Sequence, residues 1–182
     1  MKCQSSFSRH HKNDDGFTLI EAMVVMIVGV MVLAGAAAGI NKLFVANNVS
    51  TEAQNIQSIA ANMKTIASSE GGYSEIPSNK EAIDFKIFPS NMKIEQQDNT
   101  VKNVWGGKVT IEGTDDSYTL TYPSVPSEEC IQISSKLRNA SWDSLTVKGA
   151  AGEKKIDPTT SLTDIQAACG SDSKVQLVFV GH

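Results

Sequence analysis

An uninterrupted apolar segment near the N-terminus constrains the fold of this chain more than any other feature. Residues 22–40 contain no charged side chain, and Glu21 and Lys42 flank them. As an α-helix, these 19 residues would be roughly 28 Å long, close to the ~30 Å hydrocarbon core of a bilayer. The segment is longer than the apolar core of a usual signal peptide, which has ~7–15 residues. We therefore expect a membrane-spanning helix that is retained as structure, in a protein delivered through a membrane.

The helical pattern continues beyond this segment. Apolar side chains recur at steps of three, four and seven residues, which is the spacing of one helix face. No proline interrupts the chain before Pro77, and Gly71-Gly72 is a typical helix stop. We expect one helix over residues 17–70, apolar on every face in its first half and amphipathic in its second. The residues expected on the inner face are Val45, Val49, Ile56, Ile59, Ala60, Met63, Ile66 and Ala67, and those expected on the outer face are Asn47, Asn48, Glu52, Asn55, Gln57 and Lys64.

The rest of the chain, residues 71–182, has the patterns of one globular domain. Residues 71–103 are expected to form a mixed connector. Residues 108–112 and 117–122 alternate polar and apolar side chains around a turn, which predicts an antiparallel hairpin. We expect Pro123 and Pro126 to end this hairpin, because proline donates no hydrogen bond to a sheet.

Further elements are expected after the hairpin. The patterns predict a helix over residues 128–139, a short strand over 144–147 and an apolar final strand over 175–180. Ser161 and Asp164 have capping-box spacing, with Asp in place of Glu, and would begin another short helix. The fold class is therefore α+β, with a long N-terminal helix packed on an antiparallel sheet. The side chains expected to face inward from the two short helices are Cys130, Ile133, Leu137, Leu162, Ile165 and Cys169.

Charge and histidine content narrow the function classes. The chain has 16 Lys+Arg and 20 Asp+Glu without a basic patch, which argues against a nucleic-acid binder. Of its three histidines, two precede residue 16, which argues against His-based catalysis and His-rich metal sites. The acidic pairs at 115–116 and 128–129 fit solvated positions better than metal ligands. We expect no enzyme, no metal and no cofactor. For Trp105 and Trp142, packing is favoured over the alternative of sugar-binding platforms.

Two cysteines lie in the polar part of the chain, Cys130 and Cys169, whereas Cys3 lies in the charged N-terminal tail. An exported chain reaches an oxidising compartment, which pairs such cysteines. Closing a loop with 38 intervening residues stabilises a fold by about 4 kcal/mol in the chain-entropy description. The alternative is two buried free thiols. We predict a disulfide that bounds residues 130–169.

The junction Gly16-Phe17-Thr18-Leu19-Ile20-Glu21 closely resembles the processing site of bacterial type IV pilins. The resemblance implies that a prepilin peptidase removes residues 1–16 as a leader, cutting between Gly16 and Phe17, and that the new amine of Phe17 is methylated. It also implies that Glu21 pairs with the Phe17 amine of the next subunit in a fibre. A carboxylate in a membrane helix costs up to ~2.5–3.5 kcal/mol at the bilayer centre. The alternative for Glu21 is an interfacial position that only favours the helix N-terminus.

Other segments resemble type IVb pilins more specifically. Asn103-Val104-Trp105-Gly106-Gly107 is similar to the segment that leads into their first strand. The final strand is similar to the one that joins their sheet non-sequentially. Two features depart from the wider family. Asp14 and Asp15 stand where basic residues usually precede the glycine, and Ala38 stands where many type IVa pilins have a proline.

The resemblance implies that the chain is a major pilin. In that role, residues 22–40 would span the membrane before assembly and form the core of the fibre afterwards. Its implied partners are further copies of the chain, the prepilin peptidase, an assembly platform and ATPase, and an unknown surface receptor. Its implied location is the bacterial inner membrane and then an extracellular pilus used for adhesion, aggregation or conjugative contact. One alternative is a minor pilin or a secretion-system pseudopilin. Another is a secreted binding protein or adhesin, because residues 34–38 offer an A-x-A signal-peptide cleavage site.

Overall fold

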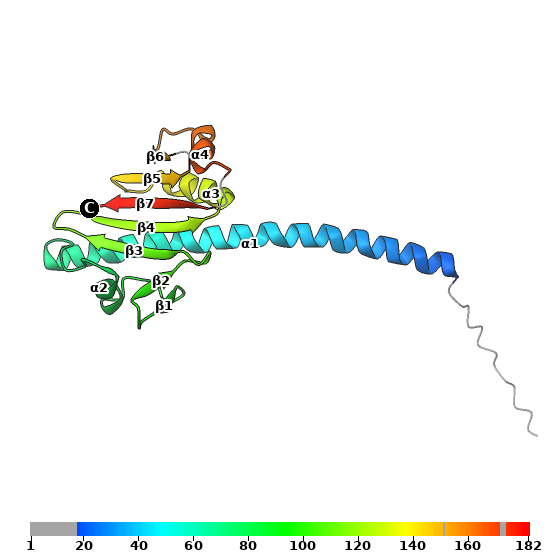
Figure 1. Cartoon of the computed structure of the whole chain (residues 1–182), viewed down its shortest axis with the longest axis horizontal. Coiled ribbons are helices and arrows are strands. Elements are labelled where there is room, and N and C mark those ends of the chain that lie inside the picture. The colour runs from blue at the N-terminus through cyan, green and yellow to red at the C-terminus, as the bar shows by residue number, and fades with distance from the viewer. Residues whose placement is uncertain (1–17, 151, 172–173) are drawn as a thin grey trace, which may run out of the picture. The chain divides into compact units, whose positions relative to one another are not determined.

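Figure 1 shows the computed structural model, which describes residues 18–150, 152–171 and 174–182. The chain divides into two compact units, residues 1–42 and residues 43–182, and we call the second unit the head. Helix α1 (Leu19–Glu70) contributes residues to both units. The helix expected over residues 17–70 is therefore confirmed from Leu19 onward.

Helix α1 ends where the glycine pair predicts. Gly71 has a φ of +81°, in the left-handed region that favours glycine, and its N–H donates to the Ala67 carbonyl over 2.9 Å. Within the head, apolar side chains of the expected inner face are fully buried, which confirms the helical spacing. These side chains are Val49, Ile56, Ile59 and Met63.

Within its described residues, the head contains a seven-stranded antiparallel sheet in the order β1-β2-β3-β4-β7-β5-β6. The last strand of the chain lies between β4 and β5, so it joins the sheet non-sequentially, as the resemblance implied (Figure 1). The strands are β1 (Lys93–Glu95), β2 (Thr100–Lys102), β3 (Lys108–Gly113), β4 (Tyr118–Val125), β5 (Ser144–Gly149), β6 (Gly152–Ile156) and β7 (Val175–Gly181).

Three short helices accompany the sheet in the described part of the head: α2 (Asn79–Asp84), α3 (Ser127–Leu137) and α4 (Leu162–Cys169). The predictions of α3 and α4 are confirmed, and Ser161 caps α4 by accepting from the Asp164 N–H over 3.1 Å. The inward position expected for Leu162 is wrong, because its side chain is 59% exposed. As the first residue of α4, it lies at the outer end of the buried stripe.

One apolar core joins α1 to the sheet. Alternate side chains of β7 face this core, because successive residues of a strand point to opposite faces. On β4, Tyr118, Leu120 and Tyr122 are buried in the same way, and the Tyr118 ring lies 5.1 Å from the Tyr73 ring. The amphipathic half of α1 is thus buried by residues far away in sequence.

Two expectations about strands and connectors are wrong. Residues 71–103 are not a simple connector, because they contain α2, β1 and β2. These elements have only three to six residues, which is too few for a periodic pattern to stand out. In addition, β4 continues through Pro123 and ends at Val125, directly before Pro126, so the expectation is wrong for Pro123 and confirmed for Pro126. A register shift between Tyr122 and Val125 accommodates Pro123, as bulges commonly do.

Candidate functional site

The start of α1 is closed by a reciprocal pair of hydrogen bonds between Thr18 and Glu21. The Thr18 hydroxyl oxygen accepts from the Glu21 N–H over 3.3 Å. A Glu21 carboxylate oxygen accepts from the Thr18 N–H over 3.4 Å and from the Thr18 hydroxyl over 3.2 Å. This arrangement is a capping box, which satisfies backbone donors that a helix start leaves unpaired. Glu21 therefore has a role within its own subunit. Gly16 and Phe17, the other residues of the predicted processing and pairing site, lie outside the described residues.

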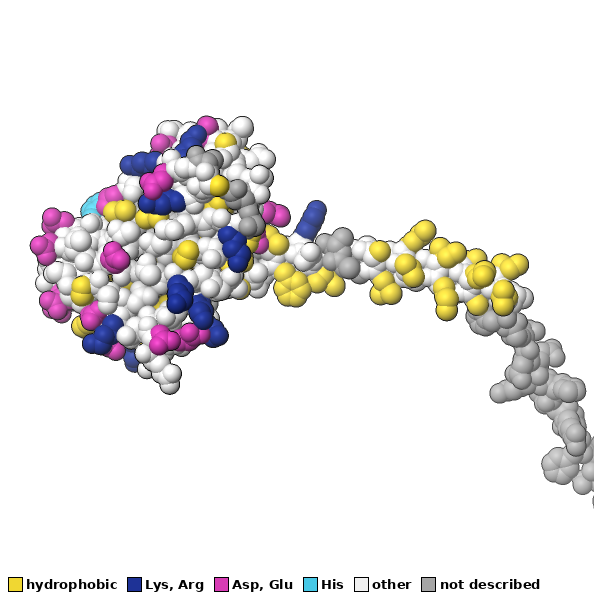
Figure 2. Space-filling view, in the orientation of Figure 1, with side chains coloured by type: hydrophobic (Ala, Val, Ile, Leu, Met, Phe, Trp, Pro, Cys, Tyr) yellow, Lys and Arg dark blue, Asp and Glu magenta, His cyan; other side chains and the backbone are white. Residues whose placement is uncertain are grey.

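Helix α1 exposes large apolar side chains along its first half (Figure 2). Fifteen such side chains between Leu19 and Phe44 are each 53–77% exposed. Covering them would be worth on the order of 20–40 kcal/mol, at about 1.5–3 kcal/mol for each side chain. That amount exceeds the whole stability of a typical domain, about 5–15 kcal/mol. The segment therefore needs lipid or other helices around it. Among the described residues, α1 is the one helix long and apolar enough to cross a membrane.

Within the head, α1 buries a carboxylate. Glu52 is only 3% exposed, although the sequence pattern places it on the outer face, and the same correction applies to Asn55 at 4%. One Glu52 oxygen accepts from the Val104 N–H over 2.9 Å. The other accepts from the Tyr122 hydroxyl and from Asn55 Nδ2, the latter over 3.3 Å. Among the described residues no Lys or Arg pairs with Glu52, so these hydrogen bonds alone compensate its burial.

The Tyr122 hydroxyl is kept protonated by its surroundings. Burial raises the pKa of Tyr122 well above its ordinary value of 10.0, and the neighbouring Glu52 carboxylate raises it further. A protonated hydroxyl can donate to the carboxylate, and a phenolate could not. The pair therefore ties α1 to β4 over the whole neutral pH range.

The segment before β3 positions the backbone group that Glu52 binds. Asn103 Oδ1 accepts from the N–H groups of Trp105 and Gly107 over 3.1 and 2.8 Å, and Asn103 Nδ2 donates to the Pro123 carbonyl over 2.7 Å. A Cβ at Gly107 would lie 2.1 Å from the Pro123 oxygen, so that position requires glycine. The Asn-x-aromatic-Gly-Gly pattern thus holds the loop that presents the Val104 N–H to α1.

The predicted disulfide is present between Cys130 on α3 and Cys169 on α4. The two sulfurs are 1.97 Å apart, and both cysteines are fully buried. The alternative of two free thiols is therefore wrong. The bond closes residues 130–169, which contain α3, β5, β6 and α4, into one covalently bounded region.

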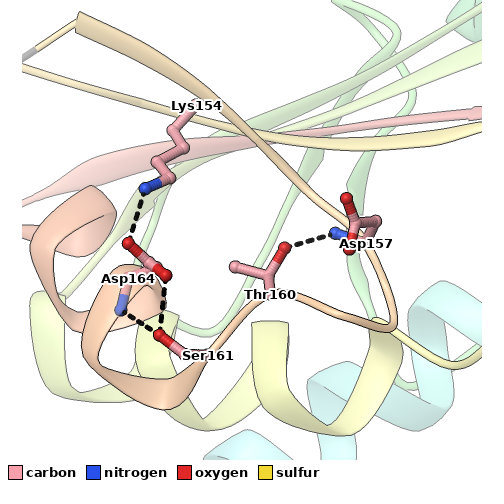
Figure 3. A network of polar contacts seen from close by, with 5 residues as sticks. All are labelled: Lys154, Asp157, Thr160, Ser161 and Asp164. Carbon is pink, nitrogen blue, oxygen red and sulfur yellow. Dashed lines mark hydrogen bonds and ion pairs between the residues drawn. The ribbon is translucent and has the colours of Figure 1, made fainter.

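Polar contacts hold the chain between β6 and α4 within this region (Figure 3). The Lys154 ammonium lies 3.0 Å from an Asp164 carboxylate oxygen, and the other Asp164 oxygen accepts from the Ser161 hydroxyl over 2.6 Å. The Ser161 hydrogen bond, followed by Lys154, holds the pKa of Asp164 below its ordinary value. In the adjoining turn, the Asp157 N–H donates to the Thr160 hydroxyl over 2.9 Å.

This architecture is that of known type IV pilins. The fold is similar to the crystal structure of a type IVb pilin from Salmonella typhi, with a TM-score of 0.56 at 20% identity, covering 71% of this chain and 97% of that chain. It is also similar to TcpA, a type IV pilin from Vibrio cholerae El Tor biotype, with a TM-score of 0.51 at 16% identity, covering 75% and 99%. At these identities the likeness shows the fold. A comparison with curated protein sequences finds no match.

Family comparisons identify the same class from sequence. The model described as PilS N terminal matches residues 46–181, and the model described as Prokaryotic N-terminal methylation motif matches residues 11–37. Because the first match covers most of the chain, the chain belongs to the PilS N-terminal family of type IV pilins. It is a structural subunit of a pilus and not an enzyme, which decides against the alternative of a secreted protein with an ordinary signal peptide.

Two features of the site were missed at the level of sequence. The Thr18-x-x-Glu21 spacing is a capping-box signal of the kind also present at Ser161, but here it lies within a largely apolar segment. The burial of Glu52 had no local signal, because its partners Val104 and Tyr122 are 52 and 70 residues away. Only the folded head brings these groups together.

Proposed function

We propose that this chain is the major subunit of a type IVb pilus, processed at Gly16-Phe17 and polymerised through α1. The prepilin would wait in the inner membrane with residues 22–40 spanning the bilayer. A prepilin peptidase would remove residues 1–16, which leaves 166 of the 182 residues, and Phe17 would carry the methylated N-terminal amine. The observation that supports this best is the fully apolar, exposed first half of α1 directly after a methylation motif.

The proposed assembly step moves α1 from lipid to neighbouring α1 helices. Lipid tails are as apolar as these side chains, so packing and polar contacts must favour the fibre. Glu21 supplies a polar contact, since its carboxylate would meet the Phe17 amine of the next subunit. Neither charge is stable alone among apolar helices, so the pair would penalise a wrong register. An assembly platform and ATPase would drive the transfer, and the assembled fibre would present the head outside the cell.

The capping box makes a sharp test of this pairing possible. Glu21→Ala removes both the charge and the cap, Glu21→Gln keeps an oxygen for the cap but removes the charge, and Thr18→Ala weakens only the cap. We expect both Glu21 variants to be processed normally but to give at least roughly tenfold less sheared fibre, the loss expected for about 1.4 kcal/mol. Thr18→Ala should lose far less. Glu70→Ala, at the other exposed end of α1, is the matched control. Normal fibre yield from Glu21→Gln would contradict the ion pair.

Two further measurements test the rest of the proposal. The mass and first residue of the mature chain should show N-methylated Phe17. Quantification of the chain in sheared fibres should show it as the most abundant subunit. A trace amount there would instead favour the alternative of a minor pilin, and a chain confined to the envelope would favour a pseudopilin.

A further inference from the structure

We propose that the disulfide-bounded region of the head carries a binding pocket for an acidic saccharide. A pocket of about 310 Å³ opens between the end of α3, the start of β5 and the end of β6. The residues that define its chemistry are Arg138, Trp142, Asp143, Lys155, Asp157 and Pro158. The inference rests on the proposed display of the head on an extracellular fibre, and it names what that head would bind there.

The pocket is lined by two cations, Arg138 and Lys155, and by two carboxylates, Asp143 and Asp157. Both carboxylates have polar partners and keep lone pairs for further hydrogen bonds: Asp143 contacts Nδ1 of His182, and Asp157 accepts from the Thr159 N–H over 2.8 Å and from the Thr159 hydroxyl over 2.6 Å. The two cations have no carboxylate partner among the ion pairs of the described residues. A ligand carboxylate would therefore find two available positive charges, from Arg138 and Lys155.

The apolar part of the pocket favours a sugar ring over a flexible acidic peptide. The Trp142 ring packs on Phe179 with 4.9 Å between ring centroids, so its position is held from behind while it lines the pocket. Together with Pro158 it offers an apolar wall to the C–H face of a saccharide. The carboxylates of Asp143 and Asp157 stand beside that wall, where they can accept from sugar hydroxyls.

The pocket is held in shape before any ligand arrives. An Arg138 terminal nitrogen donates to the Thr160 carbonyl over 2.5 Å, which ties the end of α3 to the turn after β6. The same turn is closed by the hydrogen bond between the Asp157 N–H and the Thr160 hydroxyl (Figure 3). Pre-formed walls reduce the entropy lost on binding.

Two buried donors of the pocket residues have no acceptor among the described residues. They are Nε of Arg138 and Nε1 of Trp142. A buried N–H without an acceptor costs about 1–3 kcal/mol. Both atoms are covered by protein, so neither faces the pocket opening directly.

Fluorescence titration of the detergent-solubilised, processed full chain tests the proposal. The chain has two tryptophans, so the Trp105→Phe variant leaves Trp142 as the single reporter. The probes are the methyl glycosides of N-acetylneuraminic acid and glucuronic acid, neutral methyl glucoside, and an acetylated tri-glutamate peptide. We expect a saturable change with the acidic glycosides and none with methyl glucoside. No saturation at millimolar acidic glycoside, equal binding of the neutral glycoside, or tighter binding of the peptide would each overturn the proposal.

A pair of neighbouring lysines provides the matched control. Adjacent residues of a strand point to opposite faces, and Lys154 contacts Asp164 on α4 whereas Lys155 lines the pocket. Lys155→Gln should weaken the acidic glycosides roughly tenfold, as expected for one charge-assisted hydrogen bond. Lys154→Gln should leave their affinity unchanged, and equal effects of both variants would contradict the pocket.

Fibre yield from the same variants separates this proposal from the proposed function. Both lysine variants should give sheared fibres in normal amount, because neither lysine belongs to the segment proposed to form the fibre core, residues 22–40. If wild-type chains formed no fibre, the pilus proposal would fail, and the titration would still test ligand binding to the pocket. If fibres formed and the titration gave no binding, only the pocket would fail.

Discussion

Residues 19–42 and the head deal with apolar side chains in opposite ways. In the first region, α1 holds large apolar residues more than half exposed along its length. In the head, the same helix buries Val49, Ile56, Ile59 and Met63 completely against a sheet of its own chain. The difference shows that one continuous helix serves two kinds of partner. The head is complete within the subunit, whereas the first region acquires a core only from lipid or from other copies.

The largest effect is expected from cutting the chain between the two regions. A site-specific protease site placed between Lys42 and Leu43 should release the head into the aqueous phase of washed membranes and leave the preceding segment behind. The reason is that, among the described residues, thirteen of the eighteen large exposed apolar side chains lie before the cut. Sedimentation and immunoblotting measure the release. A head that stayed in the membrane after complete cleavage would show that it has its own membrane contact.

The second largest effect is expected from removing the disulfide, which should destabilise only the head. Cys130→Ser with Cys169→Ser opens a loop with a sequence separation of 39 residues. We expect the free energy of unfolding to fall by about 4 kcal/mol, measured by urea denaturation of the full chain in detergent. Helical circular dichroism from residues 19–42 should persist through that transition. Equal urea midpoints with and without reductant in the wild-type chain would remove the disulfide from the account of stability.

The Glu52 network should give a smaller loss. Glu52→Ala leaves the Val104 N–H and the Tyr122 hydroxyl without their acceptor, so we expect a loss of about 2–4 kcal/mol from the head. Glu52→Gln keeps one acceptor and should cost less. Gln54→Ala, an exposed neighbour on α1, is the control and should change stability by less than about 0.5 kcal/mol. A Glu52→Ala variant as stable as the control would mean that water or rearrangement satisfies these donors.

The smallest effect is expected from pH, again in the head. The folded pKa values of Tyr118 and Tyr122 are both raised, chiefly by burial, so folding favours their protonated forms. This stability is fully present below the unfolded pKa of about 10 and is lost as pH rises from there toward the folded pKa, by about 1.4 kcal/mol per pH unit for each group. Urea midpoints can be measured from about pH 9 to about pH 11, roughly one unit below and above the unfolded pKa. They should fall more steeply with pH for the wild type than for Tyr122→Phe. Parallel pH profiles of the two chains would contradict the assignment.

Local and periodic features could be predicted from sequence, and long-range ones could not. The spacing of apolar residues predicts α1, Gly71 marks its end, and α3 and β7 follow from short patterns. The three-residue strands β1 and β2 escaped prediction because they depend on pairing rather than on their own composition. Of the candidate site, the Glu21 junction was visible as a motif, and the burial of Glu52 was not.

The sequence by itself determined a long helix with two characters and a processing motif, because each is encoded in neighbouring or regularly spaced residues. It also predicted the disulfide, because only two cysteines lie in the part of the chain expected to be exported. Tertiary structure alone decided which two strands flank β7, that Glu52 is buried beside Tyr122, and that Arg138, Trp142 and Lys155 share a pocket. Those outcomes depend on which distant side chains can satisfy a buried polar group or cover an apolar face. These outcomes are therefore determined by the packing of the whole folded chain.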